Sequence, residues 1–238
     1  MNNKLVNAVL LPTLMISTAV FAEDVVNEWT GTGELGFVVN NGNTQTQTIT
    51  SKITGVKDSE HWRHHLVLSG TGKSDKNDTT AEKYFGEAKS DRKLNEHYYG
   101  FALGNYEKDR FSGFDHQANL SAGAGRRMLE DSTMVLDVEL GIGVRFSETD
   151  AGTTKEEPVI RIAGDFTWEL SETSSFKQTL SADAGKDSTV YKSLTSLAAQ
   201  VTGSVSLKAS FEAKHTTSVP LGSKKTDTTT TLNLTYSF

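Results

Sequence analysis

The chain contains no cysteine among its 238 residues, which excludes disulfide bridges, thiolate metal sites and thiol nucleophiles. Its 24 Lys and Arg are outnumbered by 30 Asp and Glu, giving a formal net charge of −6. Because nucleic-acid binding needs clustered basic residues, this balance argues against a nucleic-acid partner. Only 36% of the residues are apolar. The composition is therefore too polar for a helical membrane protein, and it supplies few apolar residues for a large soluble core.

The first 22 residues have the layout of a secretory signal peptide. Lys4 supplies the positive start, an apolar stretch covers residues 5–20, and Val20-Phe21-Ala22 offers acceptable cleavage positions. The stretch falls short of the roughly 20 apolar residues that a membrane anchor needs. We expect cleavage after Ala22 and export of a mature domain, residues 23–238. This domain contains no apolar run long enough for a spanning helix.

Apolar and polar residues alternate through the mature chain, most clearly from Met134 to Phe146. The even positions of that segment are all apolar, whereas the odd positions include Asp137, Glu139 and Arg145. Successive side chains of a strand point to opposite faces, whereas a helix would scatter these residues around its circumference. The pattern predicts a strand with one apolar and one charged face.

Twelve segments show this alternation, and most are 11 residues or longer. They are Trp29–Asn40, Thr44–Val56, Trp62–Gly72, Thr80–Lys93, His97–Glu107, Asp115–Arg127, Met134–Phe146, Pro158–Leu170, Ser175–Gly185, Val190–Val201, Val205–His215 and Thr226–Phe238. Strands of soluble proteins average about 5 to 6 residues, whereas a tilted membrane-spanning strand needs roughly 9 to 11. The length predicts an all-β fold, a transmembrane antiparallel up-and-down β-barrel of about 12 strands. The alternatives are a ten-stranded barrel, because Thr44–Val56 and Thr80–Lys93 have mixed faces, and a soluble β-sandwich.

The links between these segments predict which end of the barrel faces the periplasm. Every second link is short, as periplasmic turns are. The others include four longer polar segments, Lys73–Thr79, Lys108–Phe114, Ser147–Glu157 and Thr216–Lys225. We expect both termini on the periplasmic side and surface loops at the other end, where Lys73–Asp78 and Ser147–Glu157 are candidate recognition segments.

Aromatic and terminal residues fit the same interpretation. Seven aromatic residues are expected to form the interfacial girdles of the barrel. They are Trp62, Tyr99, Phe101, Phe146, Trp168, Tyr191 and Tyr236. The last strand ends on alternating apolar residues Leu232, Leu234, Tyr236 and Phe238. This ending resembles the signal read by the bacterial barrel-assembly machinery, which would be a partner during biogenesis.

The inward faces are expected to carry the charges of the barrel. The candidate lumen residues are Arg127, Asp137, Glu139, Arg145, Arg161, Asp165, Glu169 and Lys177. A loop centred near Ala151-Gly152 would place Arg145 and Arg161 together toward the outer end, above a group of carboxylates. Two interpretations remain open at this point. The charges pair with one another and lock the barrel, or an arginine ring above an acidic ring lines a pathway for small polar solutes.

Three weaker patterns are further candidate sites. His116, with Asp115, Ser112 and Asp109 nearby, is a candidate hydrolase cluster, but adjacent strand residues face opposite sides, so we expect no enzyme. His61, His64 and His65 do not converge, so no metal is expected. Gly123-Ala124-Gly125 indicates close packing within a strand rather than nucleotide binding. No cofactor is expected.

Several blocks of sequence resemble a bacterial family described as salt-induced outer-membrane proteins, a domain of unknown function. The blocks are 31–37 with 41–44, Lys83–Asp91, Tyr106–Asp115 and Ser121–Gly125. The resemblance implies a barrel in the outer membrane of a Gram-negative bacterium, in contact with outer-membrane lipid, and supplies no catalytic residue. We expect a structural or salt-stress-linked envelope protein with a narrow charged lumen, and a small-solute pore is the alternative.

Overall fold

The structure is a computed structural model that describes residues 28–40, 46–75, 78–110 and 112–238. The expected signal peptide and its cleavage position lie outside the described residues, and both stay predictions. Within these ranges, no helix is long and apolar enough to cross a membrane.

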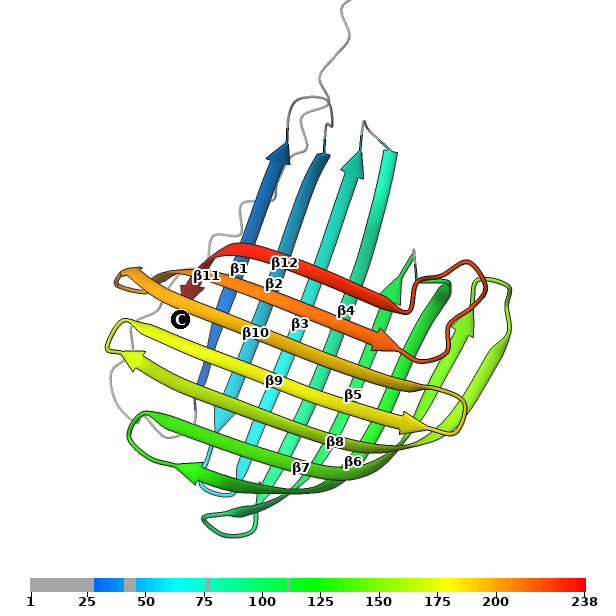
Figure 1. The fold of residues 1–238 in the computed structure, drawn as a ribbon. Coiled ribbons are helices and arrows are strands. Elements are labelled where there is room, and N and C mark those ends of the chain that lie inside the picture. Colours follow the sequence, from blue (N-terminus) through cyan, green and yellow to red (C-terminus); the bar gives the residue numbers. More distant parts are fainter. Residues whose placement is uncertain (1–27, 41–45, 76–77, 111) are drawn as a thin grey trace, which may run out of the picture.

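Twelve long strands make up the fold (Figure 1). They are β1 (Trp29–Asn40), β2 (Thr46–Asp58), β3 (Trp62–Asp75), β4 (Asp78–Lys93), β5 (Tyr98–Asp109), β6 (Phe114–Glu130), β7 (Met134–Thr149), β8 (Thr154–Ser171), β9 (Ser174–Gly185), β10 (Thr189–Thr202), β11 (Val205–Thr216) and β12 (Thr226–Ser237). Each strand pairs with its sequence neighbours in antiparallel order, and β1 pairs with β12 to close the barrel. The predicted twelve-stranded up-and-down barrel is confirmed, and the mixed-face segments form the complete strands β2 and β4.

The seam between β1 and β12 has the shortest register in the barrel. It runs only from Thr32 opposite Ser237 to Leu35 opposite Leu234. Beyond this register, the N–H of Gly31 donates to the carbonyl of Phe238 at 2.9 Å, and the N–H of Phe238 donates to the carbonyl of Gly31 at 3.0 Å. The start of β1 and the end of the chain therefore lie at the same end of the barrel, which we call the terminus end.

Deleting Phe238 should weaken closure of the barrel by about 1–3 kcal/mol, since two backbone hydrogen bonds are lost at about 0.5–1.5 kcal/mol each. We expect a smaller folded fraction when urea-unfolded protein refolds into lipid vesicles, read from heat-dependent migration on gels. Phe238→Leu keeps both backbone bonds and an apolar side chain, so it should refold like the wild type. Equal refolding of the deletion and the wild type would contradict this account of the seam.

Two of the connections at the opposite end, which we call the outer end, are shorter than the sequence suggested, whereas the predicted loop Thr216–Lys225 lies between β11 and β12 as expected. β3 continues to Asp75 and β4 begins at Asp78, while β7 continues to Thr149 and β8 begins at Thr154. The expected long loops Lys73–Thr79 and Ser147–Glu157 are therefore mostly strand, and that expectation is wrong. Polar residues on both faces hide the alternation there, yet their backbone groups still pair between strands, as between Glu148 and Thr154.

A side chain fixes the turn between β6 and β7 at the terminus end. The Asp131 carboxylate accepts hydrogen bonds from the N–H groups of Thr133 at 2.8 Å and Met134 at 2.7 Å. These bonds favour the ionised carboxylate and hold the pKa of Asp131 below its usual value. The tight turn sets the register in which Arg127 and Asp137 lie opposite each other.

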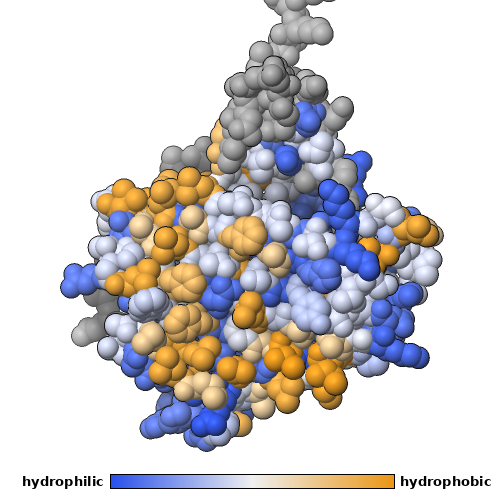
Figure 2. Space-filling model, in the orientation of Figure 1, coloured by the Kyte–Doolittle hydropathy of each residue, from blue (hydrophilic) through white to orange (hydrophobic). Residues whose placement is uncertain are grey.

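Apolar side chains cover much of the outside of the barrel (Figure 2). Exposed aromatic residues border them at both ends. Trp29, Trp62, Tyr98 and Trp168 lie near the terminus end, and Tyr84, Tyr106 and Tyr191 lie near the outer end. An apolar belt between two aromatic girdles is the pattern of a barrel that crosses a membrane.

Two of the predicted girdle residues are wrong. Tyr99 and Phe101 point inward and are only 6% and 4% exposed. The outward face of β5 carries Tyr98 and Tyr106 instead, with small residues between them. Both faces of β5 are apolar, so the alternation alone could not show which one faces outward.

The barrel is flattened, so its lumen is narrow in one direction. In Figure 1 the strands β8–β12 cross in front of β1–β5. β5 and β11 lie on opposite sides of the closed strand order, yet Lys214 of β11 contacts Glu107 of β5. Side chains of opposite walls therefore meet inside the barrel.

Candidate functional site: the charged lumen

The structure places all eight candidate lumen residues on the inward face. Asp137, Glu139 and Arg145 are buried. Arg127, Arg161 and Asp165 are half-buried. Glu169 and Lys177 are exposed, and Lys177 lies opposite the buried Ser196 in the register of β9 and β10.

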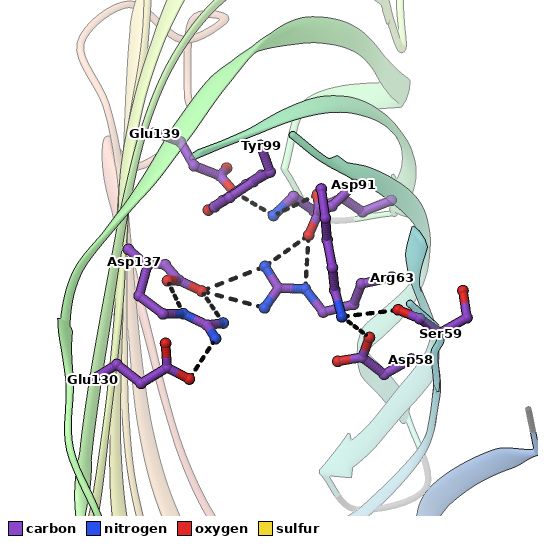
Figure 3. A network of polar contacts seen from close by, with 11 residues as sticks. Asp58, Ser59, Arg63, Asp91, Tyr99, Glu130, Asp137 and Glu139 are labelled. Atoms are coloured by element: carbon purple, nitrogen blue, oxygen red, sulfur yellow. Dashed lines mark hydrogen bonds and ion pairs between the residues drawn. The ribbon is translucent and has the colours of Figure 1, made fainter. Parts of the chain in front are cut away.

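Asp137 is the centre of an ion-pair network near the terminus end (Figure 3). Its carboxylate accepts hydrogen bonds from Arg127 at 2.9 Å and from Arg63 of β3 at 3.3 Å. Arg63 also contacts Asp91 at 2.8 Å, and Arg127 contacts Glu130 at 3.0 Å. One carboxylate on β7 thus holds two guanidinium groups, one of them from a strand four places away in the barrel order.

A tyrosine on β5 connects this network to a second buried carboxylate. The Tyr99 hydroxyl donates to Glu139 at 2.9 Å, and Lys89 of β4 also bonds to Glu139. Arg63 and Lys89 lie 5.3 Å and 5.5 Å from the centre of the Tyr99 ring, within the range of cation–π attraction. Hydrogen bonds and cations therefore hold the ring in one place.

Glycines make room for the inward aromatic residues of β5. Gly125 lies opposite Tyr99 and Gly123 lies opposite Phe101 in the register of β5 and β6. A Cβ on Gly125 would lie 2.2 Å from the Tyr99 ring, and one on Gly123 would lie 2.2 Å from the carbonyl oxygen of Leu140. The predicted close packing at Gly123-Ala124-Gly125 is confirmed. Gly125 leaves room for the Tyr99 ring, Gly123 lets β6 and β7 approach each other closely, and Gly141 of β7 leaves room for Phe101, whose ring would lie 2.8 Å from an added Cβ.

Glu107 is the second centre of charge, in the outer half of the lumen. It contacts Lys214 of β11, Lys83 of β4 at 3.4 Å and Lys192 of β10 at 3.7 Å. Lys83 also lies 3.6 Å from Glu212. β10 and β11 belong to the wall opposite β5. These contacts therefore cross the lumen along its narrow direction.

Two further arginines pair along one wall. Arg145 contacts Glu157 at 2.5 Å, and Arg161 contacts Asp183 at 3.1 Å. Arg145 lies opposite Glu157 because the hairpin turns slightly earlier than the sequence suggested. The predicted grouping of Arg145 with Arg161 is wrong, because Arg161 lies opposite Gly141, four residues along the hairpin from Arg145.

The arrangement of an arginine ring above an acidic ring is also wrong. Arg63 and Arg127 lie beside carboxylates at the terminus end, and Arg145 and Arg161 lie beside carboxylates farther out. Arg127 faces Asp137 directly rather than diagonally. Arginines and carboxylates are therefore paired at both levels of the lumen rather than separated into two rings, which lowers the cost of burying their charges.

A third group of polar contacts crosses the short seam. Glu34 of β1 accepts hydrogen bonds from Lys208 of β11 at 2.8 Å and from Asn233 of β12 at 3.1 Å. Asn233 in turn accepts a hydrogen bond from Thr50 of β2 at 3.0 Å. The side chains of four successive strands therefore reinforce the seam from inside.

Sequence reasoning missed Glu34, Arg63, Lys89, Glu107 and Lys214. Each of these contacts a residue on a strand that is not its neighbour along the chain. Hairpin register relates only consecutive strands, so it carries no information about contacts across the lumen. The one available signal was their place on the polar face of each alternating segment.

Some lumen charges have no close counter-charge. Among the described residues, Lys52, Lys177 and Glu87 form no ion pair within 4.0 Å, although each lies on the inward face. This part of the lumen is polar and less tightly paired than the two centres at Asp137 and Glu107.

The weaker candidate sites do not assemble. His116 contacts Asp115 at 3.0 Å, but the Ser112 hydroxyl donates to the Asp109 carbonyl at 2.8 Å instead of to the imidazole. His64 bonds to Ser90 at 2.9 Å and stacks on Trp62. In the ranges that the structure covers, no group of three or more His, Asp or Glu side chains is placed to hold a metal ion.

Comparison with known proteins identifies the family. A family model described as "Protein of unknown function, DUF481" matches residues 33–238. The chain belongs to this family. Over 203 residues it is 25% identical to the uncharacterized protein YdiY of Escherichia coli K12, covering 85% of this chain and 80% of YdiY.

Solved outer-membrane barrels share the fold of this DUF481 protein. The NanC porin has a TM-score of 0.52 at 10% identity, covering 89% of this chain and 99% of the porin. The translocator domain of the autotransporter NalP from Neisseria meningitidis has a TM-score of 0.50 at 11% identity, covering 91% and 90% of the two chains. An outer membrane channel from Pseudomonas putida F1 has a TM-score of 0.51 at 10% identity, covering 94% and 100%. The chain therefore has the fold of outer-membrane β-barrels.

Proposed function

We propose that this protein resides in the Gram-negative outer membrane as a structural barrel whose lumen is held shut by ion pairs. The apolar belt, the aromatic girdles and the shared fold support the location. In hydrocarbon each unsatisfied backbone group costs several kcal/mol, so a sheet that spans the membrane must close as this one does. A salt-linked role is part of the proposal and rests on the family resemblance.

The observation that carries the structural role is that carboxylates join non-adjacent strands across the lumen at two levels. Glu107 joins β5 to β11 and β10 in the outer half, and Asp137 joins β7 to β3 near the terminus end. An ion that crosses the lumen would have to separate these pairs. Separation leaves buried charges without partners, which is strongly unfavourable.

A small-solute pore is the second candidate. It is favoured by Lys52, Lys177 and Glu87, which face the lumen, form no ion pair within 4.0 Å among the described residues, and could contact small polar solutes. The fold similarity to a porin and to a channel is compatible with it. The two candidates differ in whether the wild-type lumen conducts.

Conductance across planar bilayers separates the two candidates. We expect the wild type to show no channel events over a broad range of voltage and salt. The variant Glu107→Gln/Asp137→Asn weakens both ties between the walls and should conduct. The matched control, Glu157→Gln, breaks a pair within one wall and should stay silent. Steady conductance of the wild type would contradict the closed lumen and favour a pore. A double variant that folds but does not conduct would show that these ion pairs do not close the lumen.

A further inference from the structure

The outward face of β9 and β10 carries a polar ladder in the middle of the apolar belt. The Thr195 hydroxyl donates to the Gln178 side-chain carbonyl at 2.6 Å, and the Gln178 amide donates to the Ser193 hydroxyl at 3.1 Å. All three side chains point outward, because they share a face with the exposed Leu180, Leu197 and Tyr191. We call Gln178, Ser193 and Thr195 the polar ladder.

The polar ladder lies well inside the strands. Thr195 is close to the midpoint of β10 (Thr189–Thr202), and Gln178 is close to that of β9 (Ser174–Gly185). On β12, two places from β10 in the barrel order, Thr230 is exposed on the same side as Leu232. In Figure 2 pale and blue side chains interrupt the orange ones on this face. By contrast, β7 and β8 present Leu140, Ile142, Ile160 and Ile162 outward.

Contact with lipid acyl chains is energetically unfavourable for the polar ladder. Hydrocarbon offers no hydrogen-bond partner, so outward polar groups at this depth are unfavourable unless protein covers them. Ser193 accepts a hydrogen bond from Gln178, but within the described chain its hydroxyl donates to no side chain. Bonds within the polar ladder therefore reduce the cost without removing it.

The chemistry of the polar ladder fits a second copy of the same surface. Hydroxyl and amide groups both donate and accept hydrogen bonds and carry no charge, so two copies related by a two-fold axis complement each other. The small outward residues Ala199 and Ala209 flank the polar ladder and permit close approach of two backbones. Leu197 and Phe211 supply apolar contact beside them.

We propose that the protein forms a homodimer in the membrane through the outward face of β9–β12, centred on the polar ladder. This inference rests on the membrane location given under the proposed function, but not on whether the lumen conducts.

Single-cysteine cross-linking tests the dimer directly, because the chain has no cysteine of its own. The full chain is placed in outer-membrane lipid vesicles and in native envelopes, with Ser193→Cys as the probe. The matched control is Ile142→Cys, at an exposed position on β7, outside the proposed interface. A short bifunctional thiol reagent should give a dimer band with Ser193→Cys and none with Ile142→Cys. Adding Gln178→Leu and Thr195→Val to the probe should reduce the dimer band roughly tenfold.

Three results would overturn the dimer. They are no cross-link in a folded Ser193→Cys protein, equal cross-linking of both cysteines, and a cross-link to a different protein. Heat-dependent gel migration and membrane retention are measured on the same samples. Protein that is folded and membrane-bound yet monomeric contradicts only the dimer, whereas protein that does not enter membranes contradicts the proposed function as well.

Discussion

Replacing Gly125 with alanine should destabilise the barrel by about 3 kcal/mol, because it overpacks a rigid part of the lumen. The added Cβ would lie 2.2 Å from one ring carbon of Tyr99 and 2.3 Å from another. The ring cannot easily withdraw, since its hydroxyl bonds to Glu139 and two cations lie over it. The shift should appear as a lower urea midpoint for unfolding from lipid vesicles.

Two comparisons make the result specific to this contact. In a Tyr99→Ala background, the further change Gly125→Ala should cost much less, because the ring that the added carbon meets is absent. The cost of Gly123→Ala should be the same in both backgrounds, since its Cβ would meet the backbone of Leu140 and Gly141. Gly33→Ala, at an outward glycine with nothing within 4 Å of the added carbon, should be neutral or stabilising by up to about 1 kcal/mol. A Gly125→Ala protein as stable as the wild type would contradict the packing described for β5 and β6.

Replacing Asp137 with leucine should cost about 3–5 kcal/mol, since it removes one partner from a buried ion-pair network. Asp137 is 8% exposed and is bonded to Arg63 and Arg127. Both guanidinium groups keep one other carboxylate, Asp91 and Glu130 respectively, so the cost should not reach that of two isolated charges. Tryptophan fluorescence during urea unfolding measures the change.

A double variant tests whether charge pairing is the cause. Arg127→Met combined with Asp137→Leu should be more stable than Asp137→Leu alone. The second change replaces a guanidinium group that has lost the Asp137 carboxylate with an apolar side chain. Glu130→Gln, on the exposed partner of Arg127, should change the unfolding free energy by less than about 1 kcal/mol. If Asp137→Leu proves as mild as Glu130→Gln, the network does not stabilise the barrel.

The sequence predicted the strands well, because a membrane-spanning strand needs one continuous apolar face. β7 shows this most clearly, since every even-numbered residue from Met134 to Phe146 is apolar. The prediction was wrong where the contrast between faces disappears. The outer ends of β3, β4, β7 and β8 are polar on both faces, and β5 is apolar on both faces around Tyr99 and Phe101.

The sequence also showed which charges face inward, but it could not pair them. Asp137 and Arg127 belong to one hairpin, and their register followed to within two residues. The partners Arg63 and Lys214 come from strands that are distant in sequence. Whether their side chains reach Asp137 and Glu107 depends on the shape of the barrel's cross-section. The signal peptide and the C-terminal assembly signal at Leu232, Leu234, Tyr236 and Phe238 stay predictions.

The amino-acid sequence by itself determined a closed antiparallel barrel with an apolar outer surface and a charged lumen. The reason is that side-chain direction alternates residue by residue along an extended chain. Tertiary structure alone decided that the barrel is flattened, that Glu107 and Asp137 join non-adjacent strands across the lumen, and that Gly125 and Gly141 leave room for aromatic rings inside. Those outcomes depend on distances between strands far apart in the chain, which local periodicity does not encode.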